Sequence, residues 1–342
     1  MGKPLTELLT PFHQVYVTSR VARTSTIATL HYIQGDGLDD MFLSTVLEEY
    51  SPFDAIVDFM IYSTEALKKR LPLLLTATKQ YVYLSSSRVY AGSEEPLTEN
   101  SPRLLDVSSD WEFLQTEEYA LEKARQEDLL RSSGVNHWTI IRPYITYYTE
   151  RLQLGVFEKE SWLFRAMRGR TILFPKDMAE KLTTMTFGGD VAWGIAHLIG
   201  NPRALGEAVH ITGPKSVKWG EVLEIYQNTL EKMLGIRPEV QLTDSSEWIQ
   251  DIKKDYDAVR YDRLYNRKFE NTKFHALCGP YEFVLPEIGL SRCLEQFLKE
   301  GRPFQKLHWK YEAYVDRLTG EETPLDEIPT LEGQRRYLEN RW

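Results

Sequence analysis

Short apolar runs alternate with stretches of helical spacing over roughly the first 143 residues. The apolar runs are rich in β-branched and aromatic residues, which favours strands over residues 14–18, 29–33, 53–60, 81–84 and 138–142. The stretches between them favour helices over residues 4–9, 41–49, 64–76 and 119–131. Strands that alternate with helices are typical of a parallel sheet covered by helices, so the pattern predicts an α/β fold.

From about Tyr144 this rhythm is lost. Helices are predicted over residues 163–167, 190–199, 219–234 and 287–300, with short strands at 171–174 and 208–211. Beyond residue 300 the chain becomes a polar tail rich in Glu and Arg. The second half of the chain is therefore expected to be organised differently from the first.

Composition narrows the class of protein. The 342 residues are 42% hydrophobic, enough for one large or two medium domains with a real core. A net charge of -9 without a long basic block argues against a nucleic-acid surface. The sequence has no apolar run of the ~20 residues that span a bilayer and no signal peptide, so no membrane partner is expected. Cys278 and Cys293 have neither metal-ligand spacing nor a disulfide framework, so we expect no metal and a reducing cytoplasm.

Tyr119 and Lys123 are the first candidates for chemistry. Four residues apart on a predicted helix, they lie on the same face. A lysine ammonium beside a phenol favours the phenolate, which would lower the pKa of Tyr119 toward neutrality and make it a general acid or base. Such pairs are also common on solvated helices, which is the alternative interpretation.

A second stretch upstream, residues 81–90, runs from a predicted strand into the hydroxyls of Ser85, Ser86 and Ser87. Ligands of open α/β sheets bind beyond the carboxyl ends of the strands, so these serines are expected at a ligand site. A strand ending in serines, followed by Tyr-x-x-x-Lys, resembles the short-chain dehydrogenase/reductase superfamily. The Val89-Tyr90 pair after the serines is similar to its extended branch, the NAD-dependent epimerase/dehydratase family.

This resemblance implies a Rossmann-type doubly wound parallel sheet with a smaller C-terminal α+β domain. Residues 1–150 with 185–212 would bind NAD(P), and residues 151–184 with 213–342 would form the substrate domain and tail. The resemblance also implies a nucleotide sugar as the small-molecule substrate, and it is compatible with a homodimer.

The resemblance assigns the catalytic roles residue by residue. Ser86 matches the family's catalytic hydroxyl, which hydrogen-bonds the substrate oxygen while Tyr119 moves the proton. Ser87 is a neighbouring candidate for substrate binding. Lys123 would bind the nicotinamide ribose hydroxyls and hold down the Tyr119 pKa. The alternatives are a serine that caps the turn after the strand and a solvated helix lysine.

Four further residues are candidates for cofactor binding. Arg20 follows the second expected strand of the fold, where an arginine suits the 2′-phosphate of NADP, so the cofactor is predicted to be NAD(P) with a preference for NADP. Asp36 matches the family's adenine-contacting aspartate, and Pro143 with Tyr144 matches the backbone against the nicotinamide amide. An exposed arginine, a turn aspartate and simple strand termination are the competing interpretations.

Arg165, Arg168 and Arg170 follow one another closely in a predicted helix end. Guanidinium groups suit a diphosphate, and the family binds nucleotide sugars with such residues in this region. They are therefore candidates for substrate binding, with a solvated helix end as the alternative.

One part of the family pattern is missing. The family opens with a strand and a Gly-x-x-Gly-x-x-Gly turn, whereas this chain begins Met1-Gly2, as if inside that turn. We expect a truncated start, with the alternative of a protein that gave up its cofactor. Because the absent strand is central in the sheet, the strands at Val15 and Ile56 should face each other across a gap or pair directly.

The residues after Ser86 bear on the reaction. Dehydratases of the family place an acidic pair there and decarboxylating members a Glu, whereas this chain has Ser87-Arg88. This leaves an NAD(P)-dependent epimerase or keto-sugar reductase with Tyr119 as acid/base, and Arg20 favours the reductase. The competing hypothesis is a non-catalytic Rossmann-like binding or scaffold protein without its cofactor loop. An RNA-binding relative would need a basic patch.

Overall fold

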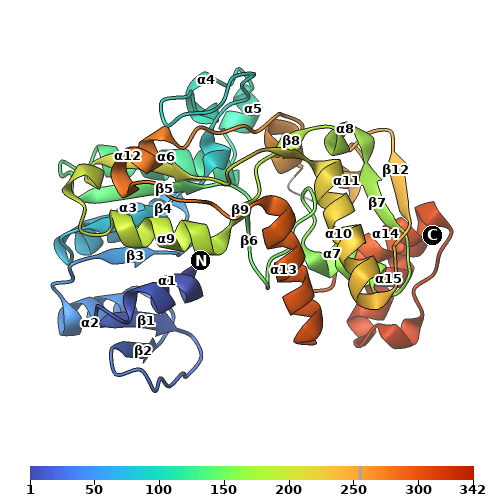
Figure 1. Ribbon diagram of the computed structural model, residues 1–342, viewed down its shortest axis with the longest axis horizontal. Coiled ribbons are helices and arrows are strands. Elements are labelled where there is room, and N and C mark those ends of the chain that lie inside the picture. The colour runs from blue at the N-terminus through green and yellow to red at the C-terminus, as the bar shows by residue number, and fades with distance from the viewer. Residues whose placement is uncertain (254–255) are drawn as a thin grey trace.

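The computed structural model describes residues 1–253 and 256–342. Its central sheet has four parallel strands in the order β10-β5-β4-β3 (Figure 1). This parallel sheet, wound by helices, confirms the predicted α/β class. The strands of the sheet are β3 (Ile56–Asp58), β4 (Tyr81–Leu84), β5 (Trp138–Pro143) and β10 (Glu207–Ile211).

Alternate side chains of the sheet enter two different cores. Val82 and Leu84 pack with one group of helices, and Tyr81 and Tyr83 pack with another on the opposite face. Both faces are therefore buried, as a doubly wound sheet requires. The first face is covered by α1 (Gly2–Leu9), α9 (Gly188–Leu198) and α12 (Thr272–Cys278). The second is covered by α2 (Asp40–Tyr50), α3 (Thr64–Thr76) and α6 (Tyr119–Arg131).

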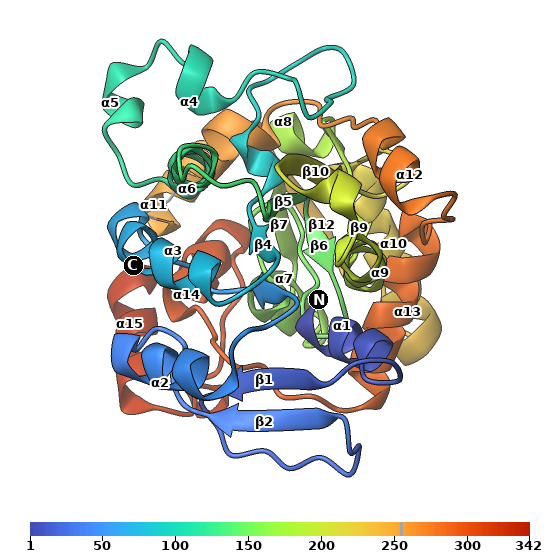
Figure 2. The same ribbon diagram turned by 90° about the vertical axis from the view of Figure 1, so that its left-hand side faces the viewer.

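Strands β1 (Val15–Ser19) and β2 (Leu30–Gln34) form a separate parallel pair. No ladder joins β1 to β3 in the part of the chain that the structure describes. The two sheets lie apart in Figure 2, with α1 beside β1. The strands at Val15 and Ile56 were predicted either to pair directly or to face each other across a gap, and in the structure they are separated by a gap. Tyr16 keeps 38% of its surface exposed, which is high for the middle of a parallel strand.

A second core begins at Tyr144 and lies in the C-terminal half of the molecule. Its largest fully buried side chains include Trp162 and Trp219. The strands of this half are β6 (Thr146–Tyr147), β7 (Ile172–Pro175), β8 (Leu182–Thr183), β9 (Thr186–Phe187), β11 (Val217–Lys218) and β12 (Val240–Thr243). Its principal helices are α7 (Lys159–Ala166), α10 (Trp219–Leu234) and α13 (Pro286–Lys299). Short helices complete the chain at α4 (Leu104–Val107), α5 (Trp111–Leu114), α8 (Lys176–Ala179) and α11 (Ile249–Ile252).

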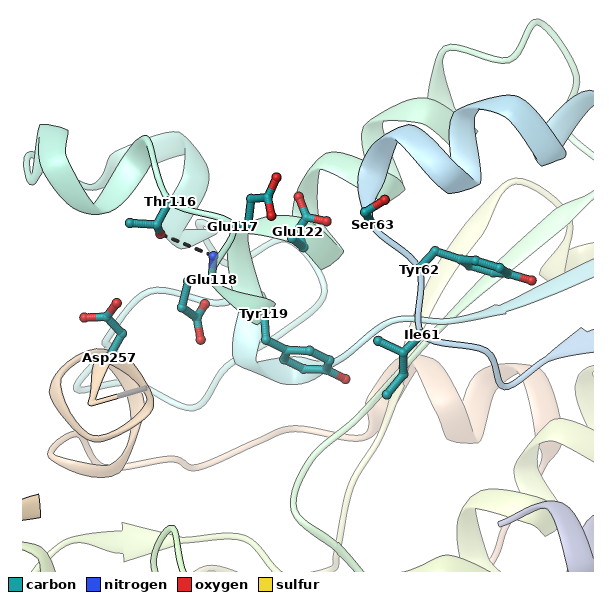
Figure 3. A pocket seen from close by; sticks show the side chains of 9 residues that line it. All are labelled: Ile61, Tyr62, Ser63, Thr116, Glu117, Glu118, Tyr119, Glu122 and Asp257. Atoms are coloured by element: carbon teal, nitrogen blue, oxygen red, sulfur yellow. Dashed lines mark hydrogen bonds between the residues drawn. The ribbon is translucent and has the colours of Figure 1, made fainter. Parts of the chain in front are cut away.

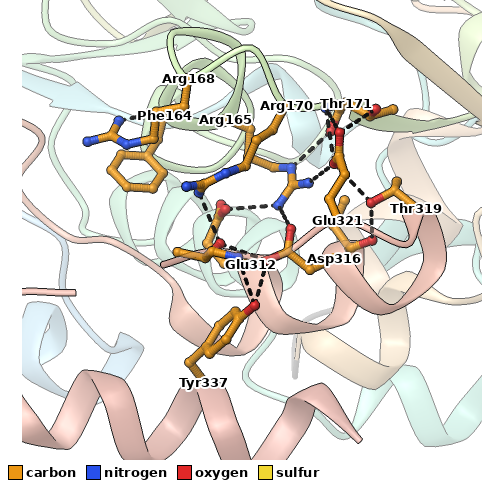
Figure 4. Close-up of polar contacts among 12 residues, drawn as sticks. Phe164, Arg165, Arg168, Arg170, Thr171, Glu312, Asp316, Thr319, Glu321 and Tyr337 are labelled. Atoms are coloured by element: carbon orange, nitrogen blue, oxygen red, sulfur yellow. Dashed lines mark hydrogen bonds and ion pairs between the residues drawn. The ribbon is translucent and has the colours of Figure 1, made fainter. Parts of the chain in front are cut away.

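The predicted polar tail folds into two helices, α14 (Trp309–Thr319) and α15 (Leu331–Arg341). The buried Arg165 of α7 binds α14: its guanidinium donates to Glu312 Oε2 at 3.0 Å and to Asp316 Oδ1 at 2.6 Å (Figure 4). Tyr337 of α15 donates to the other oxygen of Asp316 at 2.7 Å. Charged residues that suggest a solvated tail thus form a buried ion-pair cluster.

The separate β1–β2 pair is expected to open more readily than the central sheet. A two-stranded unit has few ladder bonds and buries little surface, so its local opening free energy is low. In hydrogen–deuterium exchange followed by mass spectrometry, amides of residues 15–19 and 30–34 should exchange roughly tenfold or more faster than those of 81–84 and 138–143. Equal protection of the two groups would contradict this expectation.

The tail cluster should make stability depend on pH. Burial raises the pKa of Glu312 from 4.5 to about 8, although Arg165 acts to lower it. A carboxyl with a raised folded-state pKa stabilises the fold fully below its unfolded pKa, and this contribution is lost as pH rises through the folded value. Glu312→Gln should therefore flatten the fall in unfolding free energy between pH 4.5 and 8, measured by urea denaturation. Glu332→Gln on the exposed face of α15 is the control, and identical profiles for wild type and Glu312→Gln would refute the assignment.

Candidate functional site

The predicted catalytic residues meet at the carboxyl edge of the central sheet. Tyr119 is the first residue of α6, and Ser86 caps the 3-10 turn η1 (Ser87–Val89) just beyond β4. A pocket of about 610 Å³ opens beside Tyr119 (Figure 3). It is lined by Ile61, Tyr62, Ser63, Thr116, Glu117, Glu118, Tyr119, Glu122 and Asp257.

A buried ion pair fixes helix α6 on the sheet. Arg142 of β5 donates to the two carboxylate oxygens of Glu127 at 2.8 and 2.5 Å, and Ser85 donates to the same carboxylate at 2.6 Å. Glu127 is fully buried and Arg142 almost so. One carboxylate therefore ties the Tyr119 helix to the residue before Ser86 and to the residue before Pro143. No sequence pattern predicts this pair, because its members lie on different elements.

Tyr119 does not have the lowered pKa that the sequence predicted. Burial raises the pKa of its phenol, while the charge of Arg88 and the Ser86 hydroxyl act in the opposite direction. Lys123 Nζ lies 5.9 Å from the centre of the Tyr119 ring, and burial has a larger effect on the phenol pKa than the charges around it. At neutral pH Tyr119 is therefore a protonated phenol, which suits a proton donor.

Lys123 is turned toward the core. Its ammonium donates to the Tyr83 hydroxyl at 3.0 Å and to the Leu84 carbonyl at 2.7 Å, and only 3% of the residue is exposed. Burial lowers its pKa to about 8. The interpretation as a solvated helix lysine is therefore wrong.

Asp58, at the end of β3, is a site-adjacent residue that sequence reasoning missed. It is buried and accepts hydrogen bonds from the Tyr81 and Tyr62 hydroxyls at 2.7 and 3.0 Å. Burial raises its pKa, and the charge of Lys123 acts to lower it. The available signal was an aspartate inside an otherwise apolar run. Asp58 and Lys123 are thus two buried ionisable residues that act on each other's pKa.

The three serines after β4 have different partners. Ser86 Oγ accepts from the Arg88 amide at 3.2 Å, as a cap does. Its hydroxyl also acts, through a hydrogen bond, to lower the pKa of the Tyr119 phenol. Ser87 is fully buried and donates to the Arg142 carbonyl at 2.8 Å, and Ser85 is bound to Glu127. Ser86 is thus the member of the group that faces Tyr119, while Ser87 faces the sheet rather than the pocket.

Arg88 is the second residue that the sequence analysis did not assign to the site. Its guanidinium lies over the Tyr119 ring at 5.3 Å and forms an ion pair with Glu118, the cap of α6. Its Nε is buried without a hydrogen-bond partner among the residues that the structure describes. A fixed positive charge therefore stands beside the phenol that would move the proton.

The predicted cofactor residues are divided between the two sheets. Arg20 is exposed just beyond β1, and Asp36 lies exposed beyond β2, where its Oδ1 accepts from the Leu38 amide at 3.0 Å. That bond is the turn role considered for Asp36, and it leaves the second carboxylate oxygen available. Pro143 ends β5, and Tyr144 is buried with its hydroxyl on Asp262 Oδ2 at 3.1 Å.

The three arginines predicted to hold a diphosphate lie with the C-terminal helices. Arg165 is fully buried in the cluster with Glu312 and Asp316. Arg168 and Arg170 both bind Glu327, each at 2.7 Å. These carboxylates occupy the guanidinium groups, so we do not place the three arginines in the candidate site.

The described residues contain no group of three His, Cys, Asp or Glu side chains arranged to hold a metal ion. Within the same residues, no helix has the length and apolar character needed to cross a membrane.

Solved structures with this fold cover most of the chain. UDP-glucose 4-epimerase from Bifidobacterium longum, in complex with NAD+ and UDP, has a TM-score of 0.63 at 16% identity and covers 88% of this chain and 96% of its own. dTDP-glucose 4,6-dehydratase from Bacillus anthracis, in complex with NAD, has a TM-score of 0.62 at 14% identity and covers 87% of this chain and 93% of its own. An epimerase from Methanothermobacter thermautotrophicus has a TM-score of 0.63 at 16% identity and covers 88% of this chain and 89% of its own.

No family model matches the sequence. The chloroplast stem-loop binding protein of 41 kDa b from Arabidopsis thaliana is 29% identical over 187 residues, which are 54% of this chain and 45% of that protein. The match therefore spans less than half the length of that relative. The resemblance inferred from Ser86, Tyr119 and Lys123 is confirmed for the fold. The chain has the fold of the NAD-dependent epimerases and dehydratases, the extended branch of the short-chain dehydrogenase/reductase superfamily.

Proposed function

We propose that this chain is an NAD(P)-dependent enzyme of the epimerase/dehydratase family that acts on a nucleotide sugar with Tyr119 as acid/base. The observation that carries the proposal is the meeting of Tyr119, Ser86 and Arg88 beside the pocket at the carboxyl edge of the sheet. Neighbours of the same fold, in complex with NAD and with UDP or UDP-glucose, support this class of ligand.

The residues present fit a nicotinamide dinucleotide in their donor chemistry. The first turn of α1, whose cap has no side-chain hydrogen bond, offers backbone N–H groups beside β1 (Figure 2). Arg20 would hold a 2′-phosphate and Asp36 the adenine, with the backbone of Pro143 and Tyr144 against the nicotinamide amide. Lys123 would bind the ribose through the one N–H that its bonds to Tyr83 and Leu84 leave over. When bound, the cofactor supplies the hydride acceptor or donor.

The chain's own residues supply proton transfer and positioning. Ser86 would hold the substrate oxygen by a hydrogen bond, and Tyr119 would give its proton to that oxygen or take it away. Because burial keeps the phenol protonated, the donor role is favoured, which is the direction of ketone reduction. The positive charge of Arg88 would lower the cost of the phenolate that is left behind.

The reaction is proposed to be epimerisation or keto-sugar reduction. Ser87 is held by the Arg142 carbonyl and Arg88 is cationic, so neither supplies the acid that elimination or decarboxylation would need after Ser86. The expected setting is the cytoplasm, which suits two free cysteines, and the fold is compatible with a homodimer.

The match to a stem-loop binding protein favours a second candidate, a non-catalytic protein that binds RNA. The net charge of -9 opposes it, because RNA affinity depends on phosphate contacts with Lys and Arg. A stem-loop RNA that shifts the chain in an electrophoretic assay, with no cofactor binding in calorimetry, would favour this candidate over the enzyme.

Tyr119→Phe should abolish turnover and leave the fold intact, because it removes a single hydroxyl. The measurements are reduction of a UDP-keto-sugar followed by nicotinamide absorbance and epimerisation of UDP-sugars followed by separation of the product sugars, with cofactor affinity measured separately by calorimetry. Ser86→Ala should cost less, of the order of 10²–10³-fold, as for one lost oxyanion donor. Tyr314→Phe on α14 is the matched control, and a Tyr119→Phe variant that keeps most of its activity would remove Tyr119 from the mechanism.

The cofactor preference should depend on Arg20. We expect NADP(H) to bind more tightly than NAD(H), because a guanidinium pairs with the 2′-phosphate that NAD lacks. Calorimetric titration of both cofactors should show this preference in wild type and its loss in Arg20→Ala. Arg203→Ala, another exposed arginine, is the control. Equal affinities in wild type that the Arg20 substitution does not change would make Arg20 a surface residue only.

A further inference from the structure

The loop after β3 supplies a wall of the pocket beside Tyr119. Its residues Ile61, Tyr62 and Ser63 line the pocket and lead directly into α3, which begins at Thr64 (Figure 3). Ile61 is an apolar residue that keeps 70% of its surface exposed. We call residues 61–63 the pocket wall. Because a loop has no ladder of backbone hydrogen bonds, other contacts must hold this wall in place.

Two side chains of the Tyr119 helix bind the pocket wall and the residue after it. Glu122 Oε2 accepts from the Thr64 amide, and Glu122 Oε1 accepts from the Thr64 hydroxyl, each at 2.8 Å. Gln126 Nε2 donates to the Tyr62 carbonyl at 2.8 Å. Positions 119, 122 and 126 are three and four residues apart, so they share one face of α6. The helix face that carries the proton donor therefore also holds the pocket wall. We call Glu122 and Gln126 the clamp.

Glu122 also completes the start of α3. The first amides of a helix have no partner within the helix, and a carboxylate beside them is favoured by the partial positive charge there. Ser63 caps the helix by accepting from the Ala66 amide at 3.2 Å, while the Thr64 amide is bound by Glu122. The Glu122 side chain is 13% exposed and lies 3.7 Å from Arg125 on its own helix. Removing this carboxylate would leave two partly buried donors without their partner.

The turn that carries Asp36 is held by a different contact. Arg70, nearly two turns further along α3, donates to the Gly37 carbonyl at 2.9 Å. The pocket wall and the Asp36 turn are thus fixed at two separate points of the same helix. A change at Glu122 can therefore disturb the wall and leave the Asp36 turn bound.

We propose that Glu122 is a positioning residue for proton transfer by Tyr119. With Gln126 it holds the pocket wall on the Tyr119 helix, so that a sugar ring lying against Ile61 keeps its oxygen within reach of the Tyr119 hydroxyl. Glu122 acts through the wall and through Thr64, which binds both of its carboxylate oxygens. This inference rests on the proposed function and adds to it the part of the site that orients the sugar.

The kinetic test measures kcat and KM for reduction of a UDP-keto-sugar in Glu122→Ala and Thr64→Val. The first variant removes the carboxylate and the second only the hydroxyl bound to it. Because small misplacements of a reacting group are costly, kcat should fall roughly tenfold to a hundredfold in Glu122→Ala. It should fall less in Thr64→Val, which keeps the amide bond, and calorimetric affinity for NADPH should stay as in wild type.

Two variants serve as controls. Thr64→Ser keeps both donors and should retain wild-type kcat, which separates loss of the bond from a change of residue. Glu65→Ala removes an exposed carboxylate from the same first turn of α3 and should also retain it. Thermal unfolding run in parallel establishes that each variant is folded, and Thr64→Val decides the kinetic test if Glu122→Ala does not fold.

Hydrogen–deuterium exchange on the ligand-free protein tests the clamp without turnover. Amides of residues 61–66 should exchange faster in Glu122→Ala than in wild type or Glu65→Ala. If wild type neither reduces the sugar nor binds the cofactor, the proposed function fails, and faster exchange would still support the clamp. Unchanged exchange in folded Glu122→Ala would overturn the clamp. Folded variants with wild-type kcat and KM would make Glu122 a structural contact only and overturn its positioning role.

Discussion

The site depends on the buried ion pair between Glu127 and Arg142. A carboxylate and a guanidinium removed from water are costly separately, so they must stay together, and the geometry of their two hydrogen bonds leaves little freedom. Glu127 lies two turns along α6 from Tyr119, Arg142 directly precedes Pro143, and Ser85, bound to the same carboxylate, directly precedes Ser86. The relative positions of the proton donor, the hydroxyl and the end of β5 are therefore set by one interaction that contacts neither the pocket nor a ligand.

Burial then sets the electrostatics of the residues that this frame positions. The phenol of Tyr119 and the carboxyl of Asp58 have raised pKa values and the ammonium of Lys123 a lowered one, each because the charged form is desolvated. Two of the acidic residues that line the pocket already have partners for their carboxylates. Glu118 is paired with Arg88, and Glu122 accepts from both the amide and the hydroxyl of Thr64, each at 2.8 Å. The charged group that contacts the Tyr119 ring at the start of α6 is thus the guanidinium of Arg88.

What the sequence could predict was local. The Tyr119 helix has the predicted bounds, because its periodicity lies within the segment itself and Ser132, Ser133 and Gly134 directly follow its last residue. The meeting of Ser86 with Tyr119 followed from a family pattern. The partners of Arg165 could not be predicted, since Glu312, Asp316 and Glu321 lie 147–156 residues away and share no pattern with it. The predicted direction of the Tyr119 pKa shift was wrong for the same reason. Spacing shows that a lysine is near, whereas burial is a property of the whole packed core.

The separation of the two sheets leaves the proposed function with one mechanical requirement. The proton-transfer groups lie on the four-stranded sheet and its helices, whereas Arg20 and Asp36 follow the strands of the two-stranded sheet. No ladder joins β1 to β3 among the described residues, so side chains must hold the two halves in register. Arg70 of α3 does so, since its buried guanidinium donates to the carbonyls of Gly37 and Leu38, in the turn after β2, and pairs with Asp40 at 2.5 Å. A cofactor that spans both halves would therefore depend on this contact between α3 and a loop and on the packing of α1 and α2 against the central sheet, where a continuous Rossmann sheet would use backbone hydrogen bonds.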